Sequence, residues 1–403
     1  MANFKNYYRE YRVVIDMRTG MANLPLHPGK CPSWLFSHMK ELGSAIIRAV
    51  VEDYGSREVL VRLSDPFWFQ AMGCVLGFDW HSSGLTTTVC GALKEGLKPY
   101  QGELGLFLAG GKGNTSRKTP QEILTAGEKY ALSNNLQSLV YASKMAAKVD
   151  SAALQDGYQL YHHFFVFNSA GNWAVVQQGM NELNCYARRY HWLGEGLSDF
   201  VCDPHSGISC EQKGHVLNMV AAESGEARAA SAQLAREKPE LVLKVLKKMR
   251  QKPVPPGRPV QLAFDFDSVA DPVQGEPDSM LTLDLPAEHH IPNSGRMNSI
   301  LYKVYERQPE DFETLLSMPG VGPASVRALA MVAELVHGVK LSFRDPVRYS
   351  FAHGGKDGIP FPVDRGIYRH TINVLEGALK RAKLGHSDKL KAFKRLALLQ
   401  KDV

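Results

Sequence analysis

The chain has no apolar run that approaches the ~20 residues of a membrane-spanning helix. Its first residues are polar, aromatic and basic, and they lack the apolar core of a secretory signal. Its six cysteines are irregularly spaced, so the disulfide framework of small secreted proteins is not expected. From these absences we expect a cytoplasmic protein with reduced thiols and no membrane partner.

A strong excess of one charge sign is also lacking. The chain carries 47 Lys and Arg against 41 Asp and Glu, a net charge of +6. This mild excess is compatible with a polyanionic partner but does not require one. A hydrophobic content of 44% with 22% charged residues is typical of globular proteins. At 403 residues, two or three domains are expected.

The most informative stretch is residues 312–330, in which an amphipathic segment meets Pro-Gly-Val-Gly and a second helix follows at once. Gly320 and Gly322 permit a sharp turn, and Pro323 suits the first position of a helix. The free amides of that helix's first turn, at the positive end of its dipole, favour an anion such as a phosphate diester.

This stretch resembles the helix-hairpin-helix element of DNA repair proteins. Residues 361–370 extend the likeness, because they are similar to the segment that follows the hairpin in the endonuclease III superfamily of base-excision glycosylases. The resemblance implies that Asp364 is the catalytic aspartate. It also implies that the hairpin residues Gly320, Val321, Gly322 and Ser325 contact DNA.

Three departures from that superfamily affect the expected chemistry. Ala324 stands where bifunctional members carry a nucleophilic lysine, so a Schiff-base lyase step is not expected. An insertion that includes residues 349–358 separates the hairpin from Asp364. The superfamily's iron–sulfur cysteines are absent, because no cysteine follows Cys210. The resemblance therefore implies a monofunctional glycosylase without a cofactor.

Such an enzyme extrudes a base from the duplex and cleaves its N-glycosidic bond. Asp364 would stabilise the positive charge that develops on the sugar, or activate water as a general base. Arg365 and Arg369 would flank the phosphates, and Lys356 of the insertion would line the pocket. The alternative for Asp364 is a plain helix N-cap.

A glycine-rich basic segment at residues 105–120 is a second candidate for phosphate contact. Lys112, Arg117 and Lys118 are interleaved with glycines ahead of a helix start at Thr119. The spacing is not that of a Walker loop. The segment is either a basic loop that lies on DNA phosphates or a solvated connection.

Residues 159–167 and 172–178 alternate like strands around a turn and predict a β-hairpin. Because side chains alternate along a strand, His162 and His163 should face opposite sides. A basic–aromatic cluster follows the hairpin and is able to grip a nucleic acid backbone and stack a base. The alternative is a structural strand edge. The cluster comprises Arg188, Arg189, His191 and Trp192.

Two other constellations are able to carry catalysis. Asp79 and His81, beside serines, suit acid–base work. The hairpin region instead suits a metal-dependent DNA nuclease with its site in the N-terminal domain. Its polar residues are Asp156, His162, His163, Gln177 and Gln178. A third alternative is a nucleic-acid-binding protein without catalysis.

Cys202, His205, Cys210 and His215 are residue types that tetrahedral zinc sites use. Their spacing is not that of a common zinc finger, and the segment is equally typical of a turn. The sequence leaves zinc open at these four residues, and we expect no metal or cofactor.

Residues 251–290 are rich in proline and lack periodicity, which is typical of a linker. Within them, residues Gln261 to Phe266 resemble the short peptide that tethers repair proteins to the sliding clamp. The clamp is therefore a candidate partner besides DNA.

The sequence predicts an α+β N-terminal domain followed by an all-α helix-hairpin-helix domain. The expected parts are an α+β domain at 1–215, a helical segment at 216–250, the linker, and a helical domain at 291–403. Within these we expect a helix at 34–51, a strand at 59–63 and closing helices at 366–382 and 387–399. The whole chain also resembles an uncharacterised prokaryotic family, through residues 24–27, 77–84, 177–181 and 351–357.

Overall fold

The computed structural model describes residues 31–78, 83–132, 135–183, 185–210, 213–250, 295–347, 365–382 and 385–401. The chain forms two compact units. Unit 1 comprises Met1–Gly225 and Leu341–Val403, and unit 2 comprises Glu226–Lys340. Unit 1 is mixed α and β, and the described part of unit 2 is helical.

A five-stranded antiparallel sheet lies in the middle of unit 1, with strand order β1-β3-β4-β5-β6. The predicted hairpin is confirmed as β3 and β4, whose turn is stabilised by the Asn168 side chain accepting from the backbone N–H of Ala170 and Asn172. A small second sheet pairs β2 with β7. The strands are β1 (Leu106–Lys112), β2 (Leu154–Gln155), β3 (Gln159–Asn168), β4 (Trp173–Asn181), β5 (Tyr186–Leu193), β6 (Gly207–Ser209) and β7 (Leu217–Asn218).

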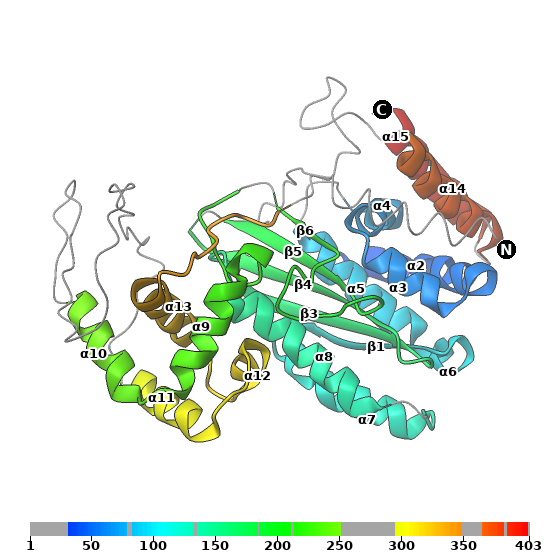
Figure 1. The fold of residues 1–403 in the computed structure, drawn as a ribbon. Helices are drawn as coiled ribbons and strands as arrows, with labels where there is room; N and C mark the ends of the chain where they lie inside the picture. The colour runs from blue at the N-terminus through cyan, green and yellow to red at the C-terminus, as the bar shows by residue number, and fades with distance from the viewer. Residues whose placement is uncertain are drawn as a thin grey trace. The chain divides into compact units, whose positions relative to one another are not determined.

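Four helices cover one face of the five-stranded sheet (Figure 1). They are α2 (Ser33–Tyr54), α3 (Ser56–Leu63), α4 (Pro66–Leu76) and α5 (Gly84–Leu97). The α4 start follows local rules, because Asp65 caps it by accepting from Phe67 N–H at 2.8 Å and Pro66 occupies the first turn. The predicted strand at 59–63 is wrong, since these residues lie in α3. A short apolar run is compatible with the periodicity of a helix as well as with that of a strand.

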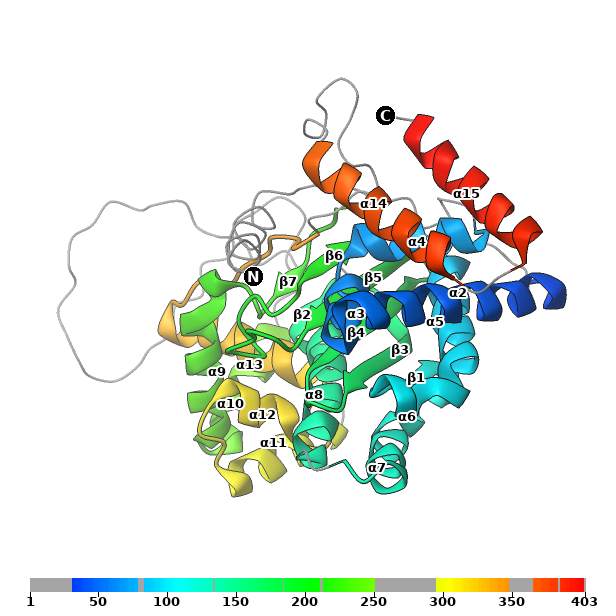
Figure 2. The ribbon, with the colours of Figure 1, turned by 90° about the vertical axis from the view of Figure 1, so that its right-hand side faces the viewer.

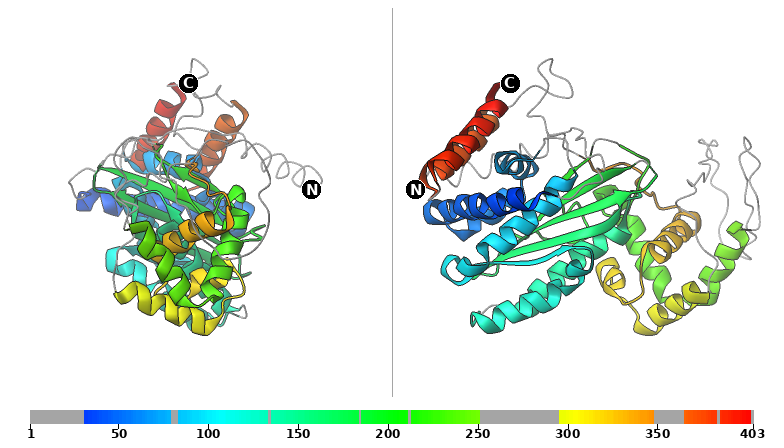
Figure 3. Two further views of the ribbon diagram at one scale, coloured as in Figure 1. Left: turned by 60° about the vertical axis from the view of Figure 1, so that its left-hand side comes forward. Right: turned by 180° about the vertical axis from the view of Figure 1, so that it is seen from behind.

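The opposite face carries α7 (Thr119–Lys129) and α8 (Leu136–Lys148), as the view from behind also shows (Figure 3). A π-helical turn, Val149–Ala153, follows α8 and leads into β2. The short elements on either side of β1 are η1 (Lys98–Tyr100), α6 (Gln101–Leu104) and η2 (Gly113–Lys118).

The closing helices α14 (Arg365–Arg381) and α15 (His386–Lys401) pack against α2 and α4 (Figure 2). Leu375, Leu379 and Leu396 are buried in the same core as the α2–α5 layer. Arg395 also donates to the carbonyl of Val75 at the end of α4. These helices therefore belong to unit 1, whereas the sequence analysis placed them in one domain with residues 312–330. Their apolar faces pack against segments far earlier in the chain: α4 precedes Leu375 by more than 250 residues.

Unit 2 contains α9 (Gly225–Arg236), α10 (Pro239–Arg250), α11 (Gly295–Arg307), α12 (Phe312–Ser317) and α13 (Pro323–His337), with α9 starting at the boundary. The expectation of continuous helix over 216–250 is corrected by β7 and η4 (Ala222–Ser224), which precede α9. Among the described helices, none is long and apolar enough to cross a membrane. The expected linker, with the clamp-like peptide, lies outside the described residues.

Candidate functional site

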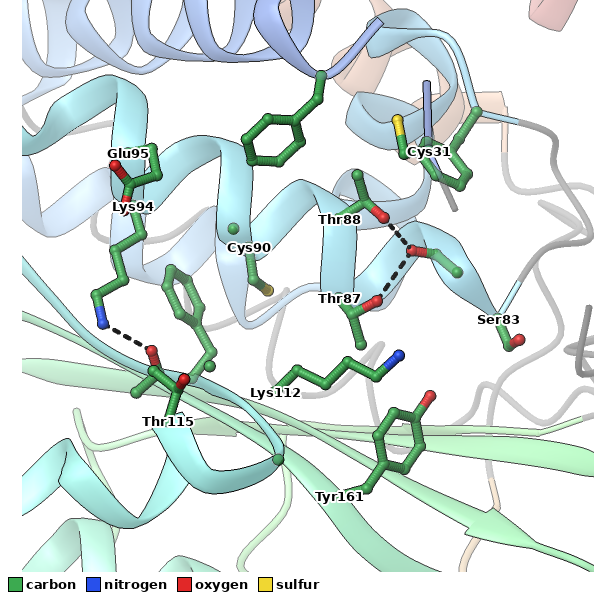
Figure 4. Close-up of a pocket in the computed structure, with 18 of the residues that line it drawn as sticks. Cys31, Ser83, Thr87, Thr88, Cys90, Lys94, Glu95, Lys112, Thr115 and Tyr161 are labelled. Carbon is green, nitrogen blue, oxygen red and sulfur yellow. Dashed lines mark hydrogen bonds between the residues drawn. The ribbon is translucent and has the colours of Figure 1, made fainter. Parts of the chain in front are cut away.

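A pocket of about 1220 Å³ lies in unit 1 between helices α2 and α5 and strands β1 and β3 (Figure 4). Its apolar lining includes Leu35, Phe36 and Phe164, and its polar lining includes Lys112 and Tyr161. Pockets that bind small molecules combine a mostly apolar wall with a few placed polar groups. This pocket has that composition.

Glycines form the border of the pocket where β1 ends. Gly110, Gly111 and Gly113 have φ of +85°, +144° and +59°, a region that side chains disfavour. A Cβ at Gly110 would lie 2.2 Å from the carbonyl oxygen of His163, so no larger residue fits. At Gly113 a Cβ would meet nothing within 4 Å. The glycine-rich segment thus leaves backbone open to the cavity.

Lys94 and Glu122 hold this border in place. The Lys94 ammonium donates to the Gly110 carbonyl at 2.8 Å and to Glu122 at 2.7 Å. The Gly110 N–H donates to the same Glu122 carboxylate at 2.7 Å. The Lys94 charge is therefore neutralised within the protein, and its role is to fix the border. The sequence did not point to Lys94, which lies in the last turn of α5.

Lys112 is the cation that the pocket leaves available. Its side chain is exposed, and its ammonium lies 5.8 Å from the centre of the Tyr161 ring. No carboxylate in the described ranges lies within ion-pair distance of it. Figure 4 shows the ammonium group pointing into the space between Thr87, Ser83 and Tyr161.

A β-bulge brings Tyr161 into the pocket. The pairing of β3 with β4 shifts register between Leu160 and His162, so Tyr161 lines the same cavity as Phe164 despite the odd spacing. Its hydroxyl accepts a hydrogen bond from Gln178. Burial raises the pKa of Tyr161, and that hydrogen bond only partly opposes the effect. The phenol stays protonated at neutral pH, and strict alternation would have placed it on the other face.

His162 is buried beside the pocket, 6.4 Å from the ring of Phe164. Neither ring nitrogen has a hydrogen-bond partner among the residues that the structure describes. Burial lowers its pKa to about 3, and the nearby His163 and Lys112 act in the same direction. A neutral, unpartnered imidazole of this kind is not a proton donor at neutral pH.

The thiols at the pocket are not activated nucleophiles. Burial raises the pKa of Cys90, although Arg189 opposes the shift. Desolvation also raises the pKa of the half-buried Cys31. A reactive cysteine needs a lowered pKa. The described lining of the pocket therefore supports ligand binding by the Lys112 ammonium, the Tyr161 phenol, hydroxyls and an apolar wall, with the carboxylate of Glu95 also in the lining.

The basic–aromatic cluster of β5 lies inside unit 1. Arg188 is 1% exposed and forms ion pairs with Asp156 at 3.0 Å and Asp345 at 2.8 Å. Its guanidinium also lies over the Tyr158 ring. One guanidinium between two carboxylates leaves excess negative charge, and burial raises the pKa of Asp156. Arg188 thus neutralises buried carboxylates.

The other cluster members are equally buried. Arg189 donates to Gln70 at 3.0 Å and to His191 at 2.8 Å, and burial lowers its pKa to about 9. Trp192 donates to Asp150 at 3.0 Å. This corrects the expectation that Arg188, Arg189, His191 and Trp192 contact DNA. A run of basic and aromatic residues is also compatible with the protein interior, where buried carboxylates and carbonyls accept their hydrogen bonds.

The polar residues of the β3–β4 hairpin do not form one site. His163 bonds Ser143 and Gln177 on the α8 face of the sheet. His162 and Gln178 lie opposite each other on the pocket side. Asp156 is bound by Arg188 and Tyr190. The opposite facing of the two histidines is as predicted, but the constellation considered for a nuclease is divided between two faces.

The remaining predicted residues have mixed outcomes. Lys112, Arg117 and Lys118 are exposed, and Arg117 and Lys118 lie in η2. Arg365 and Arg369 lie in α14, but their side chains are not described. Four further candidates lie outside the described residues, together with the clamp-like peptide: Asp79, His81, Lys356 and Asp364.

The cysteine and histidine residues considered for zinc point to separate partners. Cys210 is buried against the Tyr158 hydroxyl at 3.2 Å, and His205 bonds Asp150 at 2.5 Å. The His215 ring stacks on Phe343 at 4.8 Å. Among the described residues, which include Cys202, no group of three or more His, Cys, Asp or Glu side chains is arranged to hold a metal ion.

In unit 2, helices α12 and α13 flank a tight turn at residues 318–322, as the sequence predicts for these two helices. Gly320 is exposed with φ of +93°, a conformation that favours glycine. Val321 is 2% exposed and anchors the turn, and the Ser325 hydroxyl accepts from the Gly322 N–H at 2.9 Å. The turn therefore presents backbone outward at Gly320 and buries the apolar side chains of Met318 and Val321.

Helix α11 supplies cations beside this turn. A Cβ on Gly320 would lie 3.5 Å from Ile300 of α11. Arg296 and Lys303 precede and follow Ile300 by four and three residues, so they share its stripe of the helix, and both are exposed. The α12–α13 turn thus lies next to a basic stripe.

The comparisons with known proteins identify a family but no activity. The family described as "Protein of unknown function (DUF763)" has a model that matches residues 20–363. No curated protein and no solved structure matches the chain.

Proposed function

The chain belongs to the DUF763 family, and we propose that it binds DNA through the α12–α13 turn. The observation that carries this proposal is the exposed Gly320, which lies in the turn before the 15-residue helix α13 and beside the basic stripe of α11. The residues that carry this DNA-binding proposal all lie in unit 2.

The backbone at this turn suits a phosphate diester. First-turn amides of a helix have no partner within it. At α13, Pro323 has no N–H and the Gly322 N–H is bound by Ser325. The amide of Ala324, which is partly exposed, therefore remains at the positive end of the helix dipole, where an anion is stabilised. The cations Arg296 and Lys303 add attraction along the DNA backbone.

Adding a carboxylate at this end should weaken DNA binding selectively. In Ala324→Glu the new charge repels phosphate, while an acidic residue in the first turn favours the helix itself. We expect duplex affinity to fall by about tenfold or more, equivalent to 1.4 kcal/mol. Fluorescence anisotropy with a labelled duplex at fixed salt measures this.

The matched control is Val336→Glu, which adds the same charge at an exposed position near the other end of α13. If net charge alone governed binding, both variants would weaken it equally. Equal loss in the two variants, or no loss in either, would count against the turn as the DNA contact.

The reaction that the sequence resemblance favours is base excision at Asp364. We propose that Asp364→Asn abolishes release of a base from duplexes that each carry one modified base. General acid–base groups contribute roughly 10²–10⁴-fold, so a loss of about 100-fold or more is expected. Alkali-labile abasic sites formed in the presence of a chelator are the readout.

Asp357→Asn, in the insertion before Asp364, is the matched control and should retain activity. Direct cleavage of the DNA strand that a chelator abolishes would contradict base excision and indicate a metal-dependent nuclease instead. A shift in duplex mobility without any chemical change in the DNA would indicate a binding protein only.

A further inference from the structure

We infer that the pocket of unit 1 binds a nucleoside monophosphate, with the phosphate at Lys112 and the base against the aromatic wall. Every residue that carries this inference lies in unit 1. It therefore does not depend on DNA binding at the α12–α13 turn in unit 2.

The polar end of the pocket offers hydrogen-bond donors. The Lys112 ammonium has three N–H donors. No carboxylate among the described residues lies within ion-pair distance of it. The Tyr161 hydroxyl accepts from Gln178, so its own proton is free to be donated to a ligand. The glycine border allows a ligand to approach the backbone at Gly111 and Gly113. A group that only accepts hydrogen bonds and carries negative charge, such as a phosphate, matches these donors.

Two threonines beside Lys112 offer acceptors instead. The hydroxyls of Thr87 and Thr88 donate to the Gly84 carbonyl at 3.3 and 2.8 Å. Their remaining lone pairs accept hydrogen bonds, which suits the hydroxyl groups of a sugar. Figure 4 shows Lys112 between these threonines and Tyr161, so phosphate donors and sugar acceptors are adjacent.

Much of the remaining lining is apolar and partly aromatic, although Glu95 and Thr115 also belong to it. Phe36, Phe78 and Phe164 line the cavity with Leu35 and Met180. Aromatic rings favour contact with another planar ring. Pockets for drug-sized ligands span roughly 300–1,000 Å³, and about 1220 Å³ has room for a base, sugar and phosphate together. Phosphate alone would leave this apolar wall uncovered.

The first experiment is calorimetric titration of the full-length protein with AMP, GMP, CMP and UMP. We expect at least one nucleotide to bind tenfold or more tightly than its nucleoside or inorganic phosphate. Lys112→Met keeps the stem and removes the charge, so nucleotide affinity should fall at least tenfold. Lys98→Met, at an exposed lysine of η1 outside the pocket lining, should bind as the wild type does.

A second variant is designed to fill the aromatic part of the pocket. Gly91 in α5 lines the pocket at an ordinary φ, and a Cβ there would lie 3.7 Å from the Phe36 ring, a normal contact. Gly91→Leu should therefore fold, with a melting temperature at least equal to that of the wild type, because leucine favours helix over glycine. The larger side chain should reduce nucleotide affinity tenfold or more.

The inference is overturned if no nucleotide binds at millimolar concentration, or if phosphate binds as tightly as the nucleotides. It is also overturned if Lys112→Met and Gly91→Leu, both folded, bind nucleotide like the wild type. Ala324→Glu should leave nucleotide binding unchanged. Failure at the α12–α13 turn is thus distinguishable from failure at the pocket.

Discussion

Replacing Arg188 by alanine is expected to lower the free energy of unfolding of unit 1 by about 3–5 kcal/mol. Its side chain is 1% exposed between Asp156 and Asp345, whose side chains are 1% and 4% exposed. Without the guanidinium, two buried carboxylates lose their cation and keep only neutral donors such as Tyr190. Denaturant titration followed by tryptophan fluorescence measures the loss, because all 5 tryptophans lie in unit 1.

Arg57 provides the matched comparison. Its ion pair with Glu195 is exposed, at 47% and 38%, so Arg57→Ala should cost less than about 1 kcal/mol. If Arg188→Ala were as stable as Arg57→Ala and yet lost DNA affinity, the structural role of Arg188 would be refuted. The DNA-contact role expected from the sequence would then be the better account.

Unit 1 is also expected to lose stability steeply as the pH falls below 6.5, the ordinary pKa of histidine. Burial lowers the pKa of His162 to about 3. Burial likewise lowers the pKa of His163, although Gln177 and Asp150 oppose the shift. For His191, burial and the nearby Arg189 both lower the pKa.

The direction of this change in stability with pH follows from proton uptake. Between pH 6.5 and the lowered pKa values, the unfolded chain binds protons that the folded chain does not, so acid favours unfolding. An imidazole contributes about 1.4 kcal/mol per pH unit while the pH lies between its folded and unfolded pKa values, as it does for His162 between about 3 and 6.5. Stability from these groups is fully present above the unfolded pKa and declines as the pH falls through that window.

His162→Phe tests this directly, because His162 has no described hydrogen-bond partner to leave unsatisfied and already lies beside Phe164. The slope of unfolding free energy against pH between 6 and 4 should become shallower by about 1.4 kcal/mol per unit. Val166→Ala, a fully buried position on the same strand, should lower stability at every pH without changing the slope. An unchanged slope in His162→Phe would contradict the assignment.

Much of the secondary structure was predictable because its signals are local. The Asp65-Pro66 pair marked the start of α4, and the alternation around Asn168 marked the β3–β4 hairpin. The glycines and Pro323 between α12 and α13 marked that turn. Each of these signals depends on the backbone preferences of a few adjacent residues, which tertiary packing did not override.

The failures share a different cause. Residues 59–63 form helix because their apolar side chains meet a helical layer, and a five-residue run does not specify the period. The run that contains Arg188 and Trp192 leaves a nucleic-acid contact and a structural strand edge open, because its charge partners are distant in sequence. Asp345, one of them, follows Arg188 by 157 residues.

Which segments bend, cap and alternate can be read from the amino-acid order, since these properties reside in neighbouring residues. Which cations are neutralised and which stay available depends on the folded arrangement. Lys94 is bound by Glu122, whereas Lys112 faces an open cavity, although both are lysines near the same glycines. Electrostatic pairing depends on distances of a few ångströms between residues far apart in the chain, and folding alone sets those distances.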